Sequence, residues 1–215
     1  MSSNSGLGLW KFYLNQPKFR FLFISSLLYF SVFPWKADDY FQYIQKREGV
    51  VLNDFVLNSI PPANFSYAIF GIIYLSIIFL LIQLLKKPTL FLWFAWAFNL
   101  ETTLRFICIY LIPLNPPLNL VELHDPLAEI FIYGENLAIT KDLFFSGHTA
   151  TMIFVCYFLE QKTQKYVAYF LTCCLAALLL LQHIHYTIDI IGAVFFTLLS
   201  IRLTKSLQLI SSPLQ

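Results

Sequence analysis

The sequence predicts an all-α integral membrane protein with six transmembrane helices, both termini cytoplasmic and an active site at the extracytoplasmic membrane face. Composition is the first observation behind this prediction: 58% of the 215 residues are hydrophobic and 12% are charged, whereas a soluble domain is about 25% charged. The second is a series of long apolar stretches that do not alternate, which favours helices over strands. The composition excludes a disordered chain and a nucleic-acid binder, and the length fits a single membrane domain over residues 1–215.

The first three predicted spans differ in character. A transmembrane helix needs about 20 apolar residues, and the first stretch, 20–35, is the shortest. It follows several basic residues, as a signal peptide does, but no small-residue cleavage site comes after it, so we expect a retained helix. Residues 66–85 form an uncharged second span, and the third, 90–112, carries Glu101 and Arg105.

The last three predicted spans cover 145–159, 167–185 and 188–203. Prolines lie where helix breakers are expected, at the boundaries of spans. The basic residues then give the orientation, because cytoplasmic connections carry an excess of Lys and Arg. With both chain ends inside, nine Lys and Arg residues fall on the inside and five on the outside. The two long outer connections are 36–65 and 113–144.

Six ionisable or polar residues fall together on the outer side of this topology. Arg105 lies near the outer end of the third span. The others open or close the later spans: Asp142, Ser146, His148, His185 and Asp189. Ionisable residues in or beside a membrane span are costly and indicate function. We therefore predict one site that all six residues share.

The segment 146–149, Ser-Gly-His-Thr, suits an anion. Gly147 lets the backbone approach a ligand closely, and the unpaired N–H groups of a helix start favour phosphate. Ser146 adds a hydroxyl donor. A plain helix cap by Ser146 is the alternative.

His185 and Asp189 are four residues apart and would share a face of one helix. A carboxylate bonded to one ring nitrogen makes the other nitrogen a better base or nucleophile. An interfacial histidine or a metal site is the alternative, although too few ligands are at hand for a metal. Arg105 suits bidentate phosphate binding, or else snorkels to the interface, and Glu101 is a candidate partner for it. We expect His183 and His124 to be surface or interface residues.

Two motifs resemble those of the type 2 phosphatidic acid phosphatase (PAP2) superfamily, and more narrowly its sphingomyelin synthase-like branch. They are Asp-Leu-Phe-Phe-Ser-Gly-His-Thr at 142–149 and His-Tyr-Thr-Ile-Asp at 185–189. Arg105, followed by Leu-Ile-Pro at 111–113, resembles an upstream segment of that branch, and 52–54 with 60–61 is a weaker echo. There are departures: Phe106 follows Arg105 where the broader superfamily has proline, and Lys141 stands where the branch has glycine.

The resemblance implies six helices around an outward-facing site that uses no metal or other cofactor. It also implies roles: His185 as the nucleophile that forms a phosphohistidine, Asp189 orienting it, and His148 as proton donor and acceptor. Arg105 and Ser146 would hold phosphoryl oxygens, beside Gly147, and Asp142 would assist His148.

The implied activity is transfer of a phosphorylated headgroup, phosphocholine or phosphoethanolamine, from a glycerophospholipid to ceramide or another lipid alcohol. A lipid phosphatase or phospholipase C-like hydrolase with the same site is the alternative, and a non-enzymatic lipid-binding or transport protein is a third. The expected location is the bacterial inner membrane or, in a eukaryote, the Golgi, endoplasmic reticulum or plasma membrane.

Overall fold

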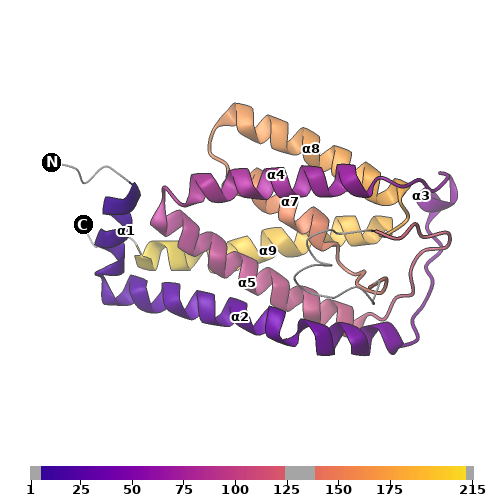
Figure 1. The fold of residues 1–215 in the computed structure, drawn as a ribbon, viewed down its shortest axis with the longest axis horizontal. Helices are drawn as coiled ribbons and strands as arrows, with labels where there is room; N and C mark the ends of the chain where they lie inside the picture. Colours follow the sequence, from indigo (N-terminus) through magenta and orange to yellow (C-terminus); the bar gives the residue numbers. More distant parts are fainter. Residues whose placement is uncertain (1–5, 124–138, 212–215) are drawn as a thin grey trace.

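The computed structural model describes residues 6–123 and 139–211, and within them the chain folds into eight helices. Helices α2, α4, α5, α7, α8 and α9 form an elongated bundle, with α1 packed across one end and α3 at the other (Figure 1). No strand occurs in the described part of the chain, where a single bridge joins Val50 to Leu114. The bounds are α1 (Gly6–Leu14), α2 (Pro17–Lys46), α3 (Phe55–Asn58), α4 (Ser66–Leu84), α5 (Pro88–Leu111), α7 (Gly147–Phe158), α8 (Lys162–Leu181) and α9 (Thr187–Ser211).

The bundle helices alternate in direction, so their connections gather at two opposite ends. At the α1 end, the turn between α4 and α5 meets the turn between α7 and α8, where Lys87 pairs with Glu160. Trp10 of α1 donates to the carbonyl of Leu85 at the same end, with an Nε1–O distance of 2.6 Å. The opposite end, which we call the α3 end, carries the start of α7 and the turn between α8 and α9.

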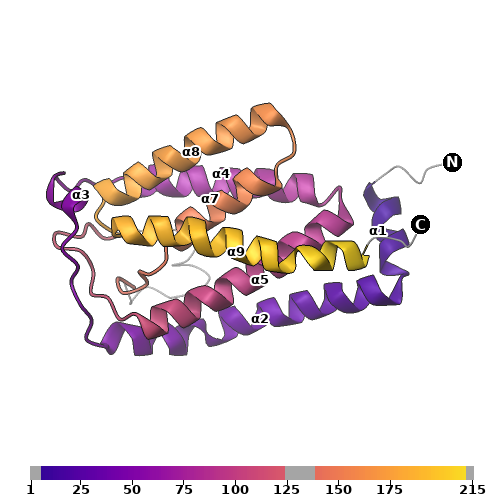
Figure 2. The same ribbon diagram turned by 180° about the vertical axis from the view of Figure 1, so that it is seen from behind.

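The core lies between α4, α5, α7, α8 and α9 and is rich in aromatic side chains. Phe94 packs edge-on against Phe154 and Phe158, with ring centroids 5.6 Å and 5.5 Å apart. Helix α9 lies along α5 (Figure 2), and the Trp93 indole donates to the carbonyl of Ile201 across this contact, at 3.2 Å. Many of the remaining large apolar side chains face outward, as they do where lipid replaces water as the solvent.

Among the described residues, three helices are long and apolar enough to cross a membrane: α4, α8 and the Thr187–Lys205 part of α9. This pattern is that of a multi-pass membrane protein. Helix α7 has 12 residues and spans only about 18 Å at 1.5 Å per residue, against about 30 Å of hydrocarbon. Helix α5 is long enough, but Asn99, Glu101 and Arg105 make it more polar. The topology of six spans with both ends in the cytoplasm therefore stays a prediction.

The helix that contains the first predicted span, 20–35, extends beyond it at both ends. Helix α2 passes through Pro34 and continues to Lys46. Its extension is stabilised by packing, because Ala37, Phe41 and Ile44 are all buried. The Tyr40 hydroxyl also donates to a backbone carbonyl of α5, that of Phe106, at 2.6 Å. Tertiary contacts thus outweigh the helix-breaking tendency of one proline.

Candidate active site

The predicted site residues come together at the α3 end of the bundle. The start of α7 supplies Ser146 and His148, the start of α9 supplies Asp189, and the C-terminal third of α5 supplies Arg105. A backbone hydrogen bond from Ser146 N–H to the carbonyl of Asp189, 3.1 Å long, ties the two helix starts together. Residues distant in sequence therefore share one small region.

Ser146 is the N-cap of α7, as the plainer of its two interpretations predicted. Its hydroxyl oxygen accepts hydrogen bonds from the backbone N–H and the hydroxyl of Thr149, at 3.3 Å and 3.2 Å. The residue is fully buried. In both bonds the oxygen accepts, so capping the helix does not use the hydroxyl proton of Ser146.

The guanidinium group of Arg105 lies flat against the backbone at Gly147. A Cβ atom at residue 147 would lie 2.9 Å from both Cζ and Nε of Arg105, so only glycine allows this approach. Arg105 Nε donates to the carbonyl of Phe145 at 3.0 Å, and Nη2 pairs with an Asp142 carboxylate oxygen at 2.5 Å. These contacts hold the cation at the N-terminus of α7.

Glu101, one turn before Arg105 on α5, lies within range of the Arg105 charge. Its side chain is 4% exposed, and one carboxylate oxygen accepts a long bond of 3.4 Å from the Thr102 hydroxyl. The other oxygen has no hydrogen-bond partner among the described residues. Arg105 forms an ion pair with Asp142, because the loop before α7 brings that carboxylate to the guanidinium.

His185 and Asp189 form the predicted pair, although they do not lie on one helix. Helix α8 ends at Leu181 and α9 begins at Thr187, so His185 is in the turn between them and not at the end of a span. Its Nδ1 lies 3.3 Å from Oδ2 of Asp189, and the two side chains are 3% and 0% exposed. The same carboxylate oxygen accepts from the backbone N–H of Tyr186 at 2.9 Å.

This geometry determines which nitrogen of His185 is left for chemistry. Since Nδ1 faces the carboxylate, Nε2 is the nitrogen that can act as a nucleophile or base. The ring of His148 lies edge-on to that of His185, with centroids 5.8 Å apart. Nδ1 of His148 has no hydrogen-bond partner in the part of the chain that the structure describes. Two imidazoles therefore face each other beside the cation of Arg105.

The burial of His183, in the turn before His185, differs from the prediction. His183 is buried, not a surface residue, and its two ring nitrogens contact the carbonyls of Leu118 and Ile60, at 3.1 Å and 3.2 Å. His124 lies outside the described residues. No group of three or more His, Cys, Asp or Glu side chains placed to hold a metal is found over 6–123 and 139–211.

Two residues of this region were not predicted as part of the site. Tyr186 accepts a bond from the N–H of Leu52 and donates one to the carbonyl of Asn115, at 3.2 Å and 2.9 Å. Asp54 contacts the first residue of α9, Thr187. The sequence indicated Asp54 only through the weak resemblance of residues 52–54 to the family. The contacts of Asp54 join residues that are distant in sequence, so spacing along the chain does not reveal them.

Part of the chain matches a known protein family. A family model described as PAP2 superfamily C-terminal matches residues 141–206. The match contains both histidine motifs and ends before the end of α9, while Arg105 and Asp54 lie outside it. Neither the curated proteins nor the solved structures gave a match.

Proposed function

We propose that this protein transfers a phosphorylated lipid headgroup. The match of residues 141–206 to the PAP2 superfamily C-terminal family, the sphingomyelin synthase-like branch of a superfamily of lipid phosphatases and phosphotransferases, supports the proposal. The donor is a glycerophospholipid carrying phosphocholine or phosphoethanolamine, and the acceptor is the hydroxyl of ceramide or another lipid alcohol. The observation that carries the proposal is the His185–Asp189 pair facing His148 beside Arg105.

In the first step, Nε2 of His185 attacks the phosphorus of the donor. The bond from phosphorus to the glycerol oxygen breaks as the phosphorus–nitrogen bond forms, and His148, entering as the imidazolium, gives its proton to the leaving alkoxide. The products are diacylglycerol and a phosphohistidine that carries the headgroup. Asp189 holds the His185 ring through Nδ1 and stabilises its positive charge.

In the second step, the now neutral His148 removes the proton of the acceptor hydroxyl. The oxygen attacks phosphorus, the phosphorus–nitrogen bond breaks, and His185 returns to its neutral state. Arg105, the Ser146 hydroxyl and the N–H groups at the start of α7 stabilise the charge on the phosphoryl oxygens. Asp142 acts through Arg105, because its carboxylate holds the guanidinium in place.

Burial of the site supports transfer over hydrolysis. His185 is 3% exposed, and Asp189 and Ser146 are fully buried. A covalent intermediate in such a site is protected from water, so a lipid alcohol arriving through the membrane has the advantage.

In this proposal the chain is one membrane domain of six spans with both ends in the cytoplasm, and the α3 end, with the active site, faces away from the cytoplasm.

A headgroup-transfer assay tests the proposal. Purified protein in mixed micelles receives labelled phosphatidylcholine or phosphatidylethanolamine, with and without ceramide, and the variant His185→Ala serves as control. A phosphosphingolipid that forms only with ceramide and only with His185 intact supports transfer. Diacylglycerol release that ignores ceramide would identify a hydrolase, and no turnover of either donor, nor of phosphatidic acid, would leave a lipid-binding protein.

A further inference from the structure

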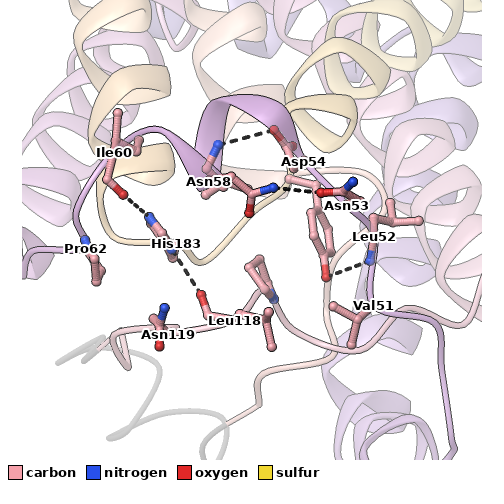
Figure 3. Close-up of a pocket in the computed structure, with 13 residues that line it drawn as sticks. Val51, Leu52, Asn53, Asp54, Asn58, Ile60, Pro62, Leu118, Asn119 and His183 are labelled. Atoms are coloured by element: carbon pink, nitrogen blue, oxygen red, sulfur yellow. Dashed lines mark hydrogen bonds between the residues drawn. The ribbon is translucent and has the colours of Figure 1, made fainter.

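The turn that carries His185 is held by two segments from the α3 end, 50–65 and 113–122. Backbone N–H of Val121 donates to the carbonyl of Gln182 at 3.1 Å, and the ring nitrogens of His183 contact the carbonyls of Ile60 and Leu118 (Figure 3). The Tyr186 hydroxyl bonds to both segments. A cavity of about 350 Å³ lies between the turn and these segments, and His185 does not line it. The side chains around His185 thus face the outer segments, while His185 faces Asp189.

Asp54, in the first of these segments, contacts the start of the helix that carries Asp189. One carboxylate oxygen, Oδ1, accepts from the N–H groups of Val56 and Leu57 at 3.0 Å and 3.4 Å and so caps the four-residue helix α3. The same atom accepts from the Thr187 hydroxyl at 3.0 Å. The other oxygen, Oδ2, accepts from the backbone N–H of Thr187 at 2.6 Å. One carboxylate therefore joins the start of α3 to the start of α9.

The cap on α9 bears on Asp189 through the first turn of that helix. Thr187 is the first residue of α9, and Asp189, two residues later, is in the same turn. The backbone N–H of Asp189 donates to the carbonyl of Tyr186 at 3.0 Å. Since the N–H groups of a first helical turn have no partner within the helix, a carboxylate bound to one of them fixes how that turn is oriented. The direction of the Asp189 side chain, and with it the His185 contact, follows from that orientation.

We propose that Asp54 is a positioning residue, which aligns Asp189 with Nδ1 of His185 by holding the N-terminus of α9. This rests on the proposed function, in which His185 is the nucleophile. A role limited to capping α3 would use Oδ1 alone and leaves the 2.6 Å contact of Oδ2 with Thr187 unexplained. The charge state fits as well. Burial by itself would raise the pKa of Asp54, but the hydrogen bonds from Thr187, Leu57 and Val56 hold it below its ordinary value. The group is an anion at neutral pH, as a helix N-terminus prefers.

Two substitutions separate the two caps. In Asp54→Ser the residue remains a good N-cap for α3, but a hydroxyl on Cβ is too short to reach Thr187. In Asp54→Asn one carbonyl oxygen remains for one of the helices, and the amide N–H₂ group opposes an N–H donor at the other. The matched control is Asp39→Asn, the same chemical change at an exposed carboxylate whose only ion pair in the described chain is with Lys36.

The readouts are kcat and KM for headgroup transfer, thermal unfolding, and the affinity for orthovanadate. Vanadate takes the place of the reacting phosphoryl group whichever lipid is the donor. We expect both Asp54 variants to lower kcat by about 10-fold to 100-fold, as misplacement near a reacting group does, with KM within about 2-fold. Vanadate affinity should fall with kcat. The fall in kcat should not be explained by a lower unfolding temperature of the Asp54 variants. Asp39→Asn should match the wild type in every readout.

A double substitution distinguishes positioning from general destabilisation. If Asp54 acts through Asp189, then Asp54→Ser costs far less in an Asp189→Asn background than in the wild type, whereas independent effects multiply. Multiplying effects, or kcat per folded molecule unchanged in both Asp54 variants, would overturn the positioning role.

Vanadate also separates this inference from the proposed function. A wild-type protein that binds vanadate but transfers no headgroup would overturn the transfer reaction alone, and vanadate affinity would still test Asp54. A wild type that neither binds vanadate nor turns over lipid would overturn both, since no nucleophile would remain to be positioned.

Discussion

Replacing Gly147 with alanine is expected to displace the phosphate-binding cation without unfolding the protein. The new Cβ would lie 2.9 Å from Cζ and Nε of Arg105, and ordinary van der Waals contact begins at 3.4 Å. The difference, 3.4 − 2.9, means that the guanidinium must retreat by about 0.5 Å. The obstructing atoms belong to the end of a flexible side chain, so the backbone of α7 can stay in place.

The size of the effect follows from the shift. A misplacement of about 1 Å can cost about 100-fold in rate, so a shift of half that size should cost roughly 10-fold, equivalent to about 1.4 kcal/mol of transition-state stabilisation. The hydrogen bond from Arg105 Nε to the Phe145 carbonyl, now 3.0 Å, would lengthen as well.

The assay compares kcat/KM for headgroup transfer with the unfolding temperature measured on the same preparation. Gly71→Ala is the matched control, since a Cβ at residue 71 of α4 would meet nothing within 4 Å. Gly147→Ala should lose activity and keep its unfolding temperature, and the control should keep both. Full activity in Gly147→Ala, or a loss that merely follows unfolding, would refute the reasoning.

Three further predictions concern the catalytic pair and the segments that hold it. Asp189→Asn should lower kcat by about 10³-fold to 10⁴-fold, because the amide no longer orients the His185 ring; a loss below 10-fold in a steady-state assay would contradict the orienting role. Tyr186→Phe removes a hydroxyl that bridges Leu52 and Asn115, and it should lower the free energy of unfolding by about 1–3 kcal/mol. Chemical denaturation measures this against Tyr67→Phe, whose ring is exposed. Equal stabilities of the two variants would contradict the bridging role. Because the pKa of Asp54 is lowered, its carboxylate stabilises the fold fully above pH 3.8, the ordinary pKa, and stabilises it less as pH falls through the lowered pKa. The difference in unfolding temperature between wild type and Asp54→Asn should therefore close on acidification. A constant difference down to about pH 2 would contradict this link between the pKa and stability.

The helices were predictable because their signals are local. Residues 66–85 are apolar and uncharged over the length of a span, and the structure places α4 at Ser66–Leu84. The end of α2 was not predictable, because its last turns are stabilised by contacts with α5, which lie far away in sequence. Pro34 is a local signal to stop, and the burial of Phe41 and Ile44 outweighs it.

The candidate site shows the same division. His148, His185 and Asp189 could be identified from their spacing and their place beside apolar spans, and the structure puts the two imidazole rings near each other. That His185 lies in a turn rather than at the end of a helix depends on Gln182 and His183 bonding to distant loops. The contact of Asp54 with Thr187 joins residues 133 positions apart, and no pattern along the chain indicates it.

Trapping a phosphorylated His185 tests the central claim most directly. Protein mixed with a phospholipid labelled in its phosphate, without any acceptor, would be quenched under alkaline conditions that preserve phosphohistidine, digested and sequenced by mass spectrometry. We predict a headgroup phosphate on His185 in the wild type, none in His185→Ala, and loss of the label when ceramide is added before the quench. Label on another residue, or transfer that proceeds at the wild-type rate in His185→Ala, would contradict the account.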